Sequence, residues 1–152
     1  MSKVVDAHLH LFSAVSEKFP RTEYPIMAEA DREELAEKLL VEMANAGVDH
    51  AIVVPLSSDD EYLHEVLTKF PGRFAGVGVF DHSNLDGVKG IEKRLTKTRL
   101  QGLRFFGLEA TVDCDVTKLS CYQVLELMSE SGMVVWFYGD LVQLAALKKI
   151  MT

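Results

Sequence analysis

Short runs of apolar residues alternate with longer amphipathic stretches along the whole chain. Each short run is rich in Val, Ile, Leu or aromatic residues and is bounded by Gly, Pro or polar residues, which is typical of β-strands. The predicted strands cover residues 4–11, 51–55, 74–80, 102–106 and 133–138. Several of these runs are apolar on both faces, as expected for strands of a parallel sheet that is covered on both sides.

The stretches between the strands carry apolar residues three and four positions apart, which predicts amphipathic helices. In the first stretch, Leu35, Leu39 and Met43 share one face. Asp31 and Glu34 precede this face with the spacing of a capping box. Comparable stripes follow each of the other four predicted strands, so every strand is expected to lead into a helix.

Five repeats of a strand followed by a helix predict an α/β fold with a parallel sheet and right-handed crossovers. Residues 1–152 are expected to form one domain, because no linker or low-complexity tract interrupts them. An open doubly wound sheet and a part of a (β/α)8 barrel both fit this order of elements. Gly76 and Gly78 fall on one face of the third strand, where we expect a crowded barrel interior or a close approach of a ligand.

Composition and charge limit the partners of such a domain. The chain is 48% hydrophobic and 26% charged, and its formal net charge is −7. This charge argues against nucleic acid and against an anionic membrane surface as the main partner, but a local arginine still allows a small anionic substrate. With two cysteines, Cys114 and Cys121, and no apolar run long enough to span a membrane, we expect a cytoplasmic protein with reduced thiols. A disulfide between the two cysteines is the alternative.

The first predicted strand contains the sequence His-x-His. Side chains alternate along a strand, so His8 and His10 point to the same side, and Asp6 is expected to join them there. Such a polar cluster on an apolar strand needs a partner, which a divalent metal or an acidic substrate would supply. Two further readings stay open, namely direct contact with substrate in the absence of a metal and a purely structural role.

Five segments in order resemble the amidohydrolase superfamily, and in particular its amidohydrolase-2 group of lactonases and decarboxylases. They read VVDAHLHLF, VVPLSSDDEYLHEVL, KFPGRFAGVGVFD, LQGLRFFG and MVVWFYGDLVQLAAL. The resemblance implies a (β/α)8 barrel and the hydrolysis of a lactone, ester or amide by attack of water. It also implies that His8 and His10 are catalytic and bind a divalent metal, Zn²⁺ or Mn²⁺. We expect Asp6 to lie deeper, where it either orients an imidazole or simply accepts a hydrogen bond behind the ligands.

The fifth strand departs from the metal-dependent pattern of this group. A histidine usually stands near the end of that strand, whereas this chain has Tyr138, as metal-independent lactonases do. We therefore expect Tyr138 to be a catalytic hydrogen-bond donor to a carboxylate or a developing oxyanion, and metal-independent activity remains open. An ordinary aromatic residue at a strand end is the alternative.

Three other side chains are predicted to bind substrate. Arg104 lies between apolar neighbours, and a guanidinium inside a barrel needs an anion, either a substrate carboxylate or an internal partner such as Asp6 or Asp81. Ser57 follows the second strand and His82 follows the third, so both are expected near the carboxyl ends of the strands. A plain turn residue is the alternative for Ser57.

A complete (β/α)8 barrel has about 250 residues, so this chain supplies only its first five βα units. The family takes a further histidine from the sixth strand and a catalytic aspartate from the eighth. We therefore expect either a fragment of a longer protein or a homo-oligomer that pairs the open edges of the first and fifth strands. A truncated, non-catalytic module for binding or assembly and a phosphoesterase with a His-x-His barrel are the alternative functions.

Overall fold

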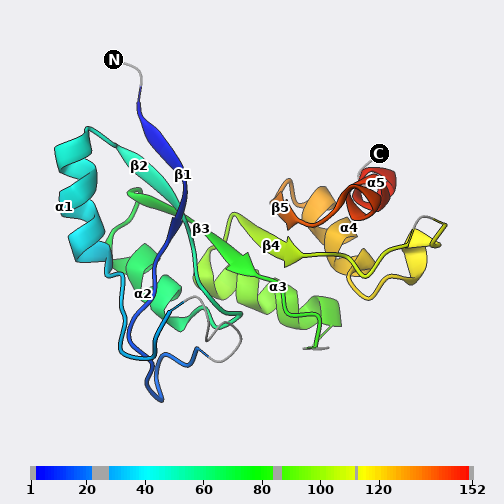
Figure 1. Cartoon of the computed structure of the whole chain (residues 1–152), viewed down its shortest axis with the longest axis horizontal. Coiled ribbons are helices and arrows are strands. Elements are labelled where there is room, and N and C mark those ends of the chain that lie inside the picture. The colour runs from blue at the N-terminus through cyan, green and yellow to red at the C-terminus, as the bar shows by residue number, and fades with distance from the viewer. Residues whose placement is uncertain (1–2, 22–27, 84–86, 112, 151–152) are drawn as a thin grey trace.

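Five parallel strands form one sheet in a computed structural model that describes residues 3–21, 28–83, 87–111 and 113–150 (Figure 1). The strands are β1 (Val5–His10), β2 (His50–Val54), β3 (Phe74–Val79), β4 (Gly102–Phe106) and β5 (Val134–Tyr138). The helices are α1 (Ala36–Ala46), α2 (Glu61–Lys69), α3 (Gly87–Thr98), α4 (Tyr122–Glu130) and α5 (Leu141–Ile150), with a short 3₁₀ helix, η1 (Val116–Lys118), before α4. These bounds confirm the predicted strands to within one residue, and a helix follows each strand as predicted.

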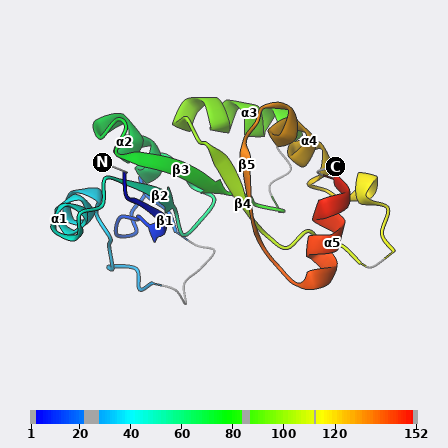
Figure 2. The ribbon, with the colours of Figure 1, turned by 90° about the horizontal axis from the view of Figure 1, so that it is seen from above.

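The order of the strands in the sheet is their order in the sequence, β1-β2-β3-β4-β5. An open doubly wound sheet would reverse direction at a switch point, which this order lacks. Figure 2 shows the five helices in an arc around the outer side of the curled sheet. The sheet is therefore the first five βα units of a barrel, and the barrel alternative is confirmed.

The two faces of the sheet differ in what they bury. The outer face packs against the helices through the main core, in which Val53 and Leu103 are fully buried beside Leu125 of α4. The inner face has a smaller apolar cluster of Val54, Val77 and Val79 in its centre, with Phe106 and Trp136 packed against it. The inner face is consequently where polar side chains can gather without entering the main core.

Gly76 and Gly78 face the helices and not the barrel interior, so the predicted role of these residues is wrong. A Cβ atom on Gly76 would lie 2.7 Å from Leu67 Cδ1, and one on Gly78 would lie 2.8 Å from Arg94 Nη2. Arg94 itself pairs with the buried Asp60, which precedes α2. The glycines therefore let α2 and α3 pack closely on β3.

The predicted capping box is also absent. Leu35 is the N-cap of α1, no side chain caps it, and the helix begins after both Asp31 and Glu34. The Ala36 N–H instead donates to the Tyr62 hydroxyl of α2 at 3.1 Å. A tertiary contact thus replaces the local cap, and a local sequence motif does not reveal it.

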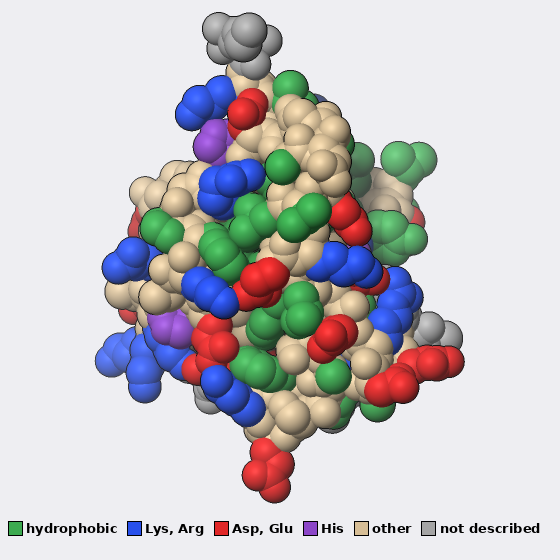
Figure 3. Space-filling model, turned by 90° about the vertical axis from the view of Figure 1, so that its left-hand side faces the viewer, with side chains coloured by type: hydrophobic (Ala, Val, Ile, Leu, Met, Phe, Trp, Pro, Cys, Tyr) green, Lys and Arg blue, Asp and Glu red, His purple; other side chains and the backbone are tan. Residues whose placement is uncertain are grey.

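The outer surface over α1 and α2 mixes both signs of charge, with hydrophobic side chains between them (Figure 3). Lys69 of α2 bonds to Glu37 of α1, and Lys97 of α3 bonds to Glu61 of α2 at 2.8 Å. Cys114 and Cys121 are free thiols, and burial raises the pKa of Cys121 to about 11. Within the described residues, no helix has the length and apolar character that crossing a membrane requires.

The two edges of the sheet carry exposed apolar side chains. Val5 is exposed on the edge strand β1 and Val134 on the edge strand β5, and Leu141 and Leu144 are exposed on α5, which follows β5. These are the surfaces that further strands or another chain would cover. Association of copies of the chain through these edges stays a prediction.

Candidate active site

The candidate site lies on the inner face, near the carboxyl ends of the strands. His10 is the last residue of β1, Arg104 lies in β4, and Tyr138 is the last residue of β5. The sheet curls so strongly that the His8 ring, on β1, meets the Trp136 ring, on β5, edge to face with 5.0 Å between their centroids. Residues far apart in sequence therefore face one another across the concave side.

A β-bulge in β1 places the two histidines. Asp6 pairs with Ala51 and Leu9 with Val53, so three residues of β1 span the distance of two in β2. Bulges of this kind turn a side chain in a new direction. The Nε2 atoms of His8 and His10 lie 3.3 Å apart as a result.

The same bulge overturns the prediction for Asp6. Asp6 pairs with Ala51 and His10 pairs with Val54, and Ala51 and Val54 point to opposite faces of β2. Asp6 therefore lies on the face of β1 opposite to His10. The Asp6 carboxylate accepts a hydrogen bond from the backbone N–H of His8 at 3.1 Å and does not orient an imidazole. Asp6 therefore stabilises the bulge.

The hydrogen bond of His10 determines which ring nitrogen is free. His10 Nδ1 lies 3.1 Å from the Val54 carbonyl oxygen, which can only accept, so Nδ1 carries the proton. Burial lowers the pKa of His10, the bond to Val54 opposes this effect, and the nearby His8 and Arg104 lower the pKa further. The neutral ring is thereby favoured, and its Nε2 presents a lone pair toward His8.

This pair fits part of a metal site. Two nitrogen ligands at about 2.05 Å from a tetrahedral zinc ion stand about 3.3 Å apart, which matches the observed separation. The Val54 carbonyl accepts the hydrogen bond of the non-ligating ring nitrogen, as backbone carbonyls commonly do for histidines that bind a metal, and this bond fixes the tautomer of His10. Across the described ranges, however, no group of three or more His, Cys, Asp or Glu side chains gathers as ligands. The described chain thus offers two ligands for such an ion.

Arg104 reaches the histidines from the opposite side. Its Nη1 lies 3.5 Å from His8 Nε2, and its guanidinium carbon lies 4.4 Å from the centre of the Phe106 ring and 5.9 Å from that of Tyr138. Partial burial lowers the pKa of His8, Arg104 lowers it further, and Asp6 opposes both. A cation held by two aromatic rings therefore stands beside two neutral imidazoles.

The other predicted site residues differ in their exposure. The Tyr138 side chain is 68% exposed on the concave side. Ser57 is buried, and its hydroxyl donates to the Pro20 carbonyl at 3.5 Å. The His82 ring packs edge to face on Phe80, and both of its ring nitrogens are buried without a hydrogen-bond partner among the described residues. The roles of Ser57 and His82 in substrate binding stay predictions.

Phe106 and Trp136 shape the site but were not among the predicted site residues. Phe106 stacks on Arg104, and Trp136 contacts His8. The signal was available, because Phe106 lies two residues after Arg104 and Trp136 two residues before Tyr138 on strands where side chains alternate.

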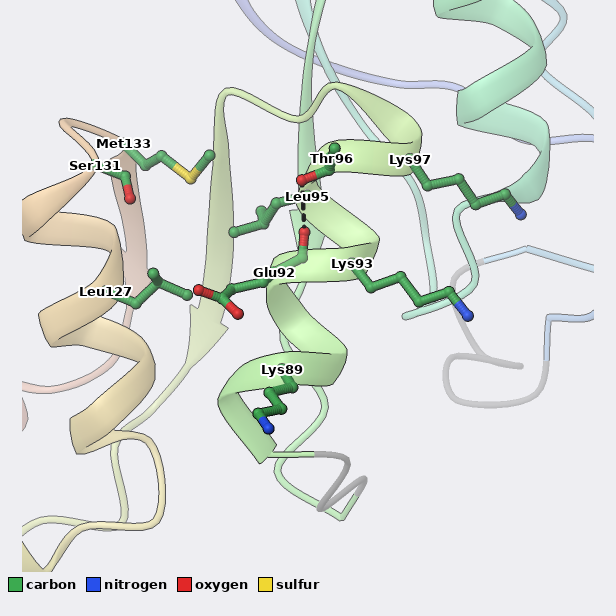
Figure 4. Close-up of a pocket in the computed structure, with 9 residues that line it drawn as sticks. All are labelled: Lys89, Glu92, Lys93, Leu95, Thr96, Lys97, Leu127, Ser131 and Met133. Atoms are coloured by element: carbon green, nitrogen blue, oxygen red, sulfur yellow. Dashed lines mark hydrogen bonds between the residues drawn. The ribbon is translucent and has the colours of Figure 1, made fainter.

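A groove of about 750 Å³ lies elsewhere on the surface, between α3 and α4. Figure 4 shows that Lys93 and Lys97 extend away from the apolar wall formed by Leu127 and Met133. The groove lies on the helical side of the sheet, whereas the two imidazoles and Arg104 meet on the inner side. We therefore assign the candidate site to the inner face.

The family model described as Amidohydrolase, that of the amidohydrolase-2 group, matches residues 5–152. The chain belongs to this amidohydrolase family. No curated protein matches the chain.

Solved structures with the same fold include amidohydrolases that share 16–20% of their residues with this chain. One is a protein from Pseudomonas putida assigned as a 2-pyrone-4,6-dicarboxylic acid hydrolase, with a TM-score of 0.70, 20% identity, and 97% of this chain and 54% of that chain covered. A similarly assigned protein from Acinetobacter baumannii, with citric acid bound, has a TM-score of 0.67 and 16% identity over 91% of this chain and 50% of that chain.

An amidohydrolase from Burkholderia multivorans with bound zinc has a TM-score of 0.60 and 19% identity, and 88% of this chain and 48% of that chain are covered. At these identities the likeness establishes the fold alone. The chain spans about half the length of the solved structures that it matches.

Proposed function

We propose that this chain carries the substrate-binding and carbonyl-polarising half of a hydrolase that opens a lactone, ester or amide of a small carboxylated compound. The observation that carries the proposal is the meeting of His8, His10 and Arg104 within hydrogen-bonding distance at the inner face of an amidohydrolase fold. Separate strands supply the imidazoles and the guanidinium, so the folded sheet alone assembles the site.

The side chains divide into an anion-binding part and a polarising part. Arg104 offers a planar fork of N–H donors to a substrate carboxylate, and the exposed Tyr138 hydroxyl can add another donor. His8 and His10 face the position beside that anion, where they polarise the carbonyl that water attacks. Phe106 and Trp136 give the site an apolar wall against which a planar substrate can lie.

His8 and His10 would also hold a divalent ion, because their separation fits two ligands of a tetrahedral ion. When bound, such an ion supplies Lewis-acid polarisation of a carbonyl and a bound water of lowered pKa. The resemblance to the family implies that a further catalytic residue comes from strands beyond the five described here, whereas binding of the carboxylate depends on residues of this chain.

The name of the Pseudomonas putida neighbour suggests 2-pyrone-4,6-dicarboxylate as the first compound to test. Trp136 is the sole tryptophan and lies against His8, so its fluorescence should change when the dicarboxylate binds. We expect binding to weaken at least about ten-fold in Arg104→Ala, because a charge-assisted bidentate contact is lost. Arg73→Ala, which removes the same charge at the opposite end of the strands, is the matched control.

Turnover is then measured by the loss of lactone absorbance with no metal, with Zn²⁺ and with Mn²⁺. Activity that disappears in His8→Ala and His10→Ala supports the proposal. Failure of wild type to bind the dicarboxylate and to hydrolyse any lactone, ester or amide of a carboxylated compound would overturn it.

A further inference from the structure

His8 Nε2 lies within reach of more than one possible partner. An imidazole nitrogen has one lone pair in the ring plane, so His8 Nε2 can accept one N–H or bind one metal ion, but not both. Arg104 can only donate, and its Nη1 lies 3.5 Å from this nitrogen. Contact with Arg104 therefore uses the electron pair that a metal ion would need.

His10 cannot relieve this competition. Its Nδ1 is bound to the Val54 carbonyl, so its Nε2 is the only ring nitrogen left to face His8, 3.3 Å away. Two lone pairs that face each other at this distance repel unless a positive group lies beside them. The guanidinium supplies such a group from within the chain.

Arg104 is also held in place from its other side. Phe106 stacks on the guanidinium at 4.4 Å, and the Tyr138 ring lies at 5.9 Å. Phe106 and Arg104 belong to one strand, whose β4–β5 pairing is continuous from Gly102 to Phe106. The guanidinium is thus part of a built arrangement.

We propose that Arg104 sets the metal affinity of this site: its guanidinium and a divalent ion compete for His8, so that wild-type protein binds the ion weakly. The inference rests on the site in the proposed function and adds the residue that selects between its metal-free and metal-bound forms. A divalent ion must displace a cation that the strand holds beside its ligands.

The test is a titration of the full chain with Co²⁺, followed by calorimetry and by the visible absorption of the bound ion. Arg104→Met keeps roughly the length of the side chain and removes its charge. We expect Co²⁺ to bind this variant at least about ten-fold more tightly. The size of the effect is taken from proton binding, where a charge within about 4–6 Å changes the affinity of a group by one to three pKa units. Arg104→Lys keeps the charge and should bind Co²⁺ like wild type. Arg73→Met is the control for net charge and should leave the affinity unchanged.

Two further variants test where Co²⁺ binds and why it binds more tightly without Arg104. The gain should disappear in the double variant His8→Ala, Arg104→Met, because one of the two ligands is then missing. Phe106→Ala frees the guanidinium and should tighten Co²⁺ binding in the same direction as Arg104→Met, which keeps the proposal testable if Arg104→Met does not fold. Equal affinity in wild type, Arg104→Met and Phe106→Ala would overturn the proposal, and so would equal affinities of Arg104→Lys and Arg104→Met.

Neither measurement depends on turnover. A protein that fails to bind or hydrolyse any carboxylated lactone refutes the proposed function, while the Co²⁺ comparison still decides the competition between Arg104 and the ion. Conversely, active protein with unchanged Co²⁺ affinity in Arg104→Met refutes the competition alone.

Discussion

Phe105 and Phe106 are neighbours in β4, and the structure predicts very different consequences for their removal. Phe105 is fully buried in the helix-facing core and stacks on Phe80, with 4.7 Å between ring centroids. Phe105→Ala leaves a cavity in this core, so we expect a loss of about 3–5 kcal/mol in the free energy of unfolding.

Phe106 lies on the inner face, where it is half-buried against Arg104. Its truncation removes a cation–π contact and some apolar area, so Phe106→Ala should cost only about 1 kcal/mol. The two variants remove the same atoms from adjacent positions of one strand. A difference in stability between the two variants therefore reflects the face of β4 on which each ring lies, and not the atoms removed or the position in the sequence.

Urea unfolding followed by circular dichroism measures both values. With a slope of about 2 kcal/mol per molar urea, Phe105→Ala should lower the midpoint by about 2 M and Phe106→Ala by about 0.5 M. Similar shifts in the two variants, or a larger shift in Phe106→Ala, would refute the assignment of the two faces of β4.

Three further predictions test the strand pairing, the site and a helix end. A Cβ on Gly102 would lie 2.0 Å from the Val134 carbonyl oxygen, so Gly102→Ala should separate β4 from β5 and abolish the edge-to-face contact that Trp136 fluorescence reports; an unchanged emission spectrum and urea midpoint would contradict this. Arg104→Met should raise the pKa of His8 in an NMR titration while leaving it below the usual value, because Arg104 is the second cause of the shift after burial; a pKa that falls or stays would contradict this. The Asp140 carboxylate accepts a hydrogen bond from the Gln143 backbone N–H at 2.9 Å, and this bond lowers the pKa of Asp140 in the folded protein. The bond therefore stabilises the fold fully above the unfolded pKa of about 4, and this stabilisation is lost as the pH falls through the folded pKa. Urea midpoints of wild type and Asp140→Ala should accordingly differ at pH 7 and converge toward pH 2, and a constant difference would contradict this.

The sequence was sufficient for the fold because its signals were local and repeated. The alternation of short apolar runs with helical stripes predicted all five βα units, and the ordered family segments distinguished a barrel from a doubly wound sheet. The side of the sheet on which Gly76 and Gly78 lie was not predictable in this way. Because β3 is apolar on both faces, alternation alone does not show which face meets the helices.

The candidate site was predictable in its members and less so in its geometry. The spacing of His8 and His10 and the apolar neighbours of Arg104 singled out the three side chains that meet at the inner face. The bulge that removes Asp6 from this group is a tertiary feature, since it appears only in the pairing of β1 with β2. Regular alternation therefore gave the wrong face for Asp6.

The order of the strands has a consequence for folding kinetics. Each strand pairs with the one before it, so the sheet can grow from its own neighbouring segments as the chain emerges from the ribosome. The site has no such advantage, because Arg104 and His8 are 96 positions apart and Trp136 must come from the last strand to touch the first. A stopped-flow refolding experiment should thus show helical signal first and the change in Trp136 emission last.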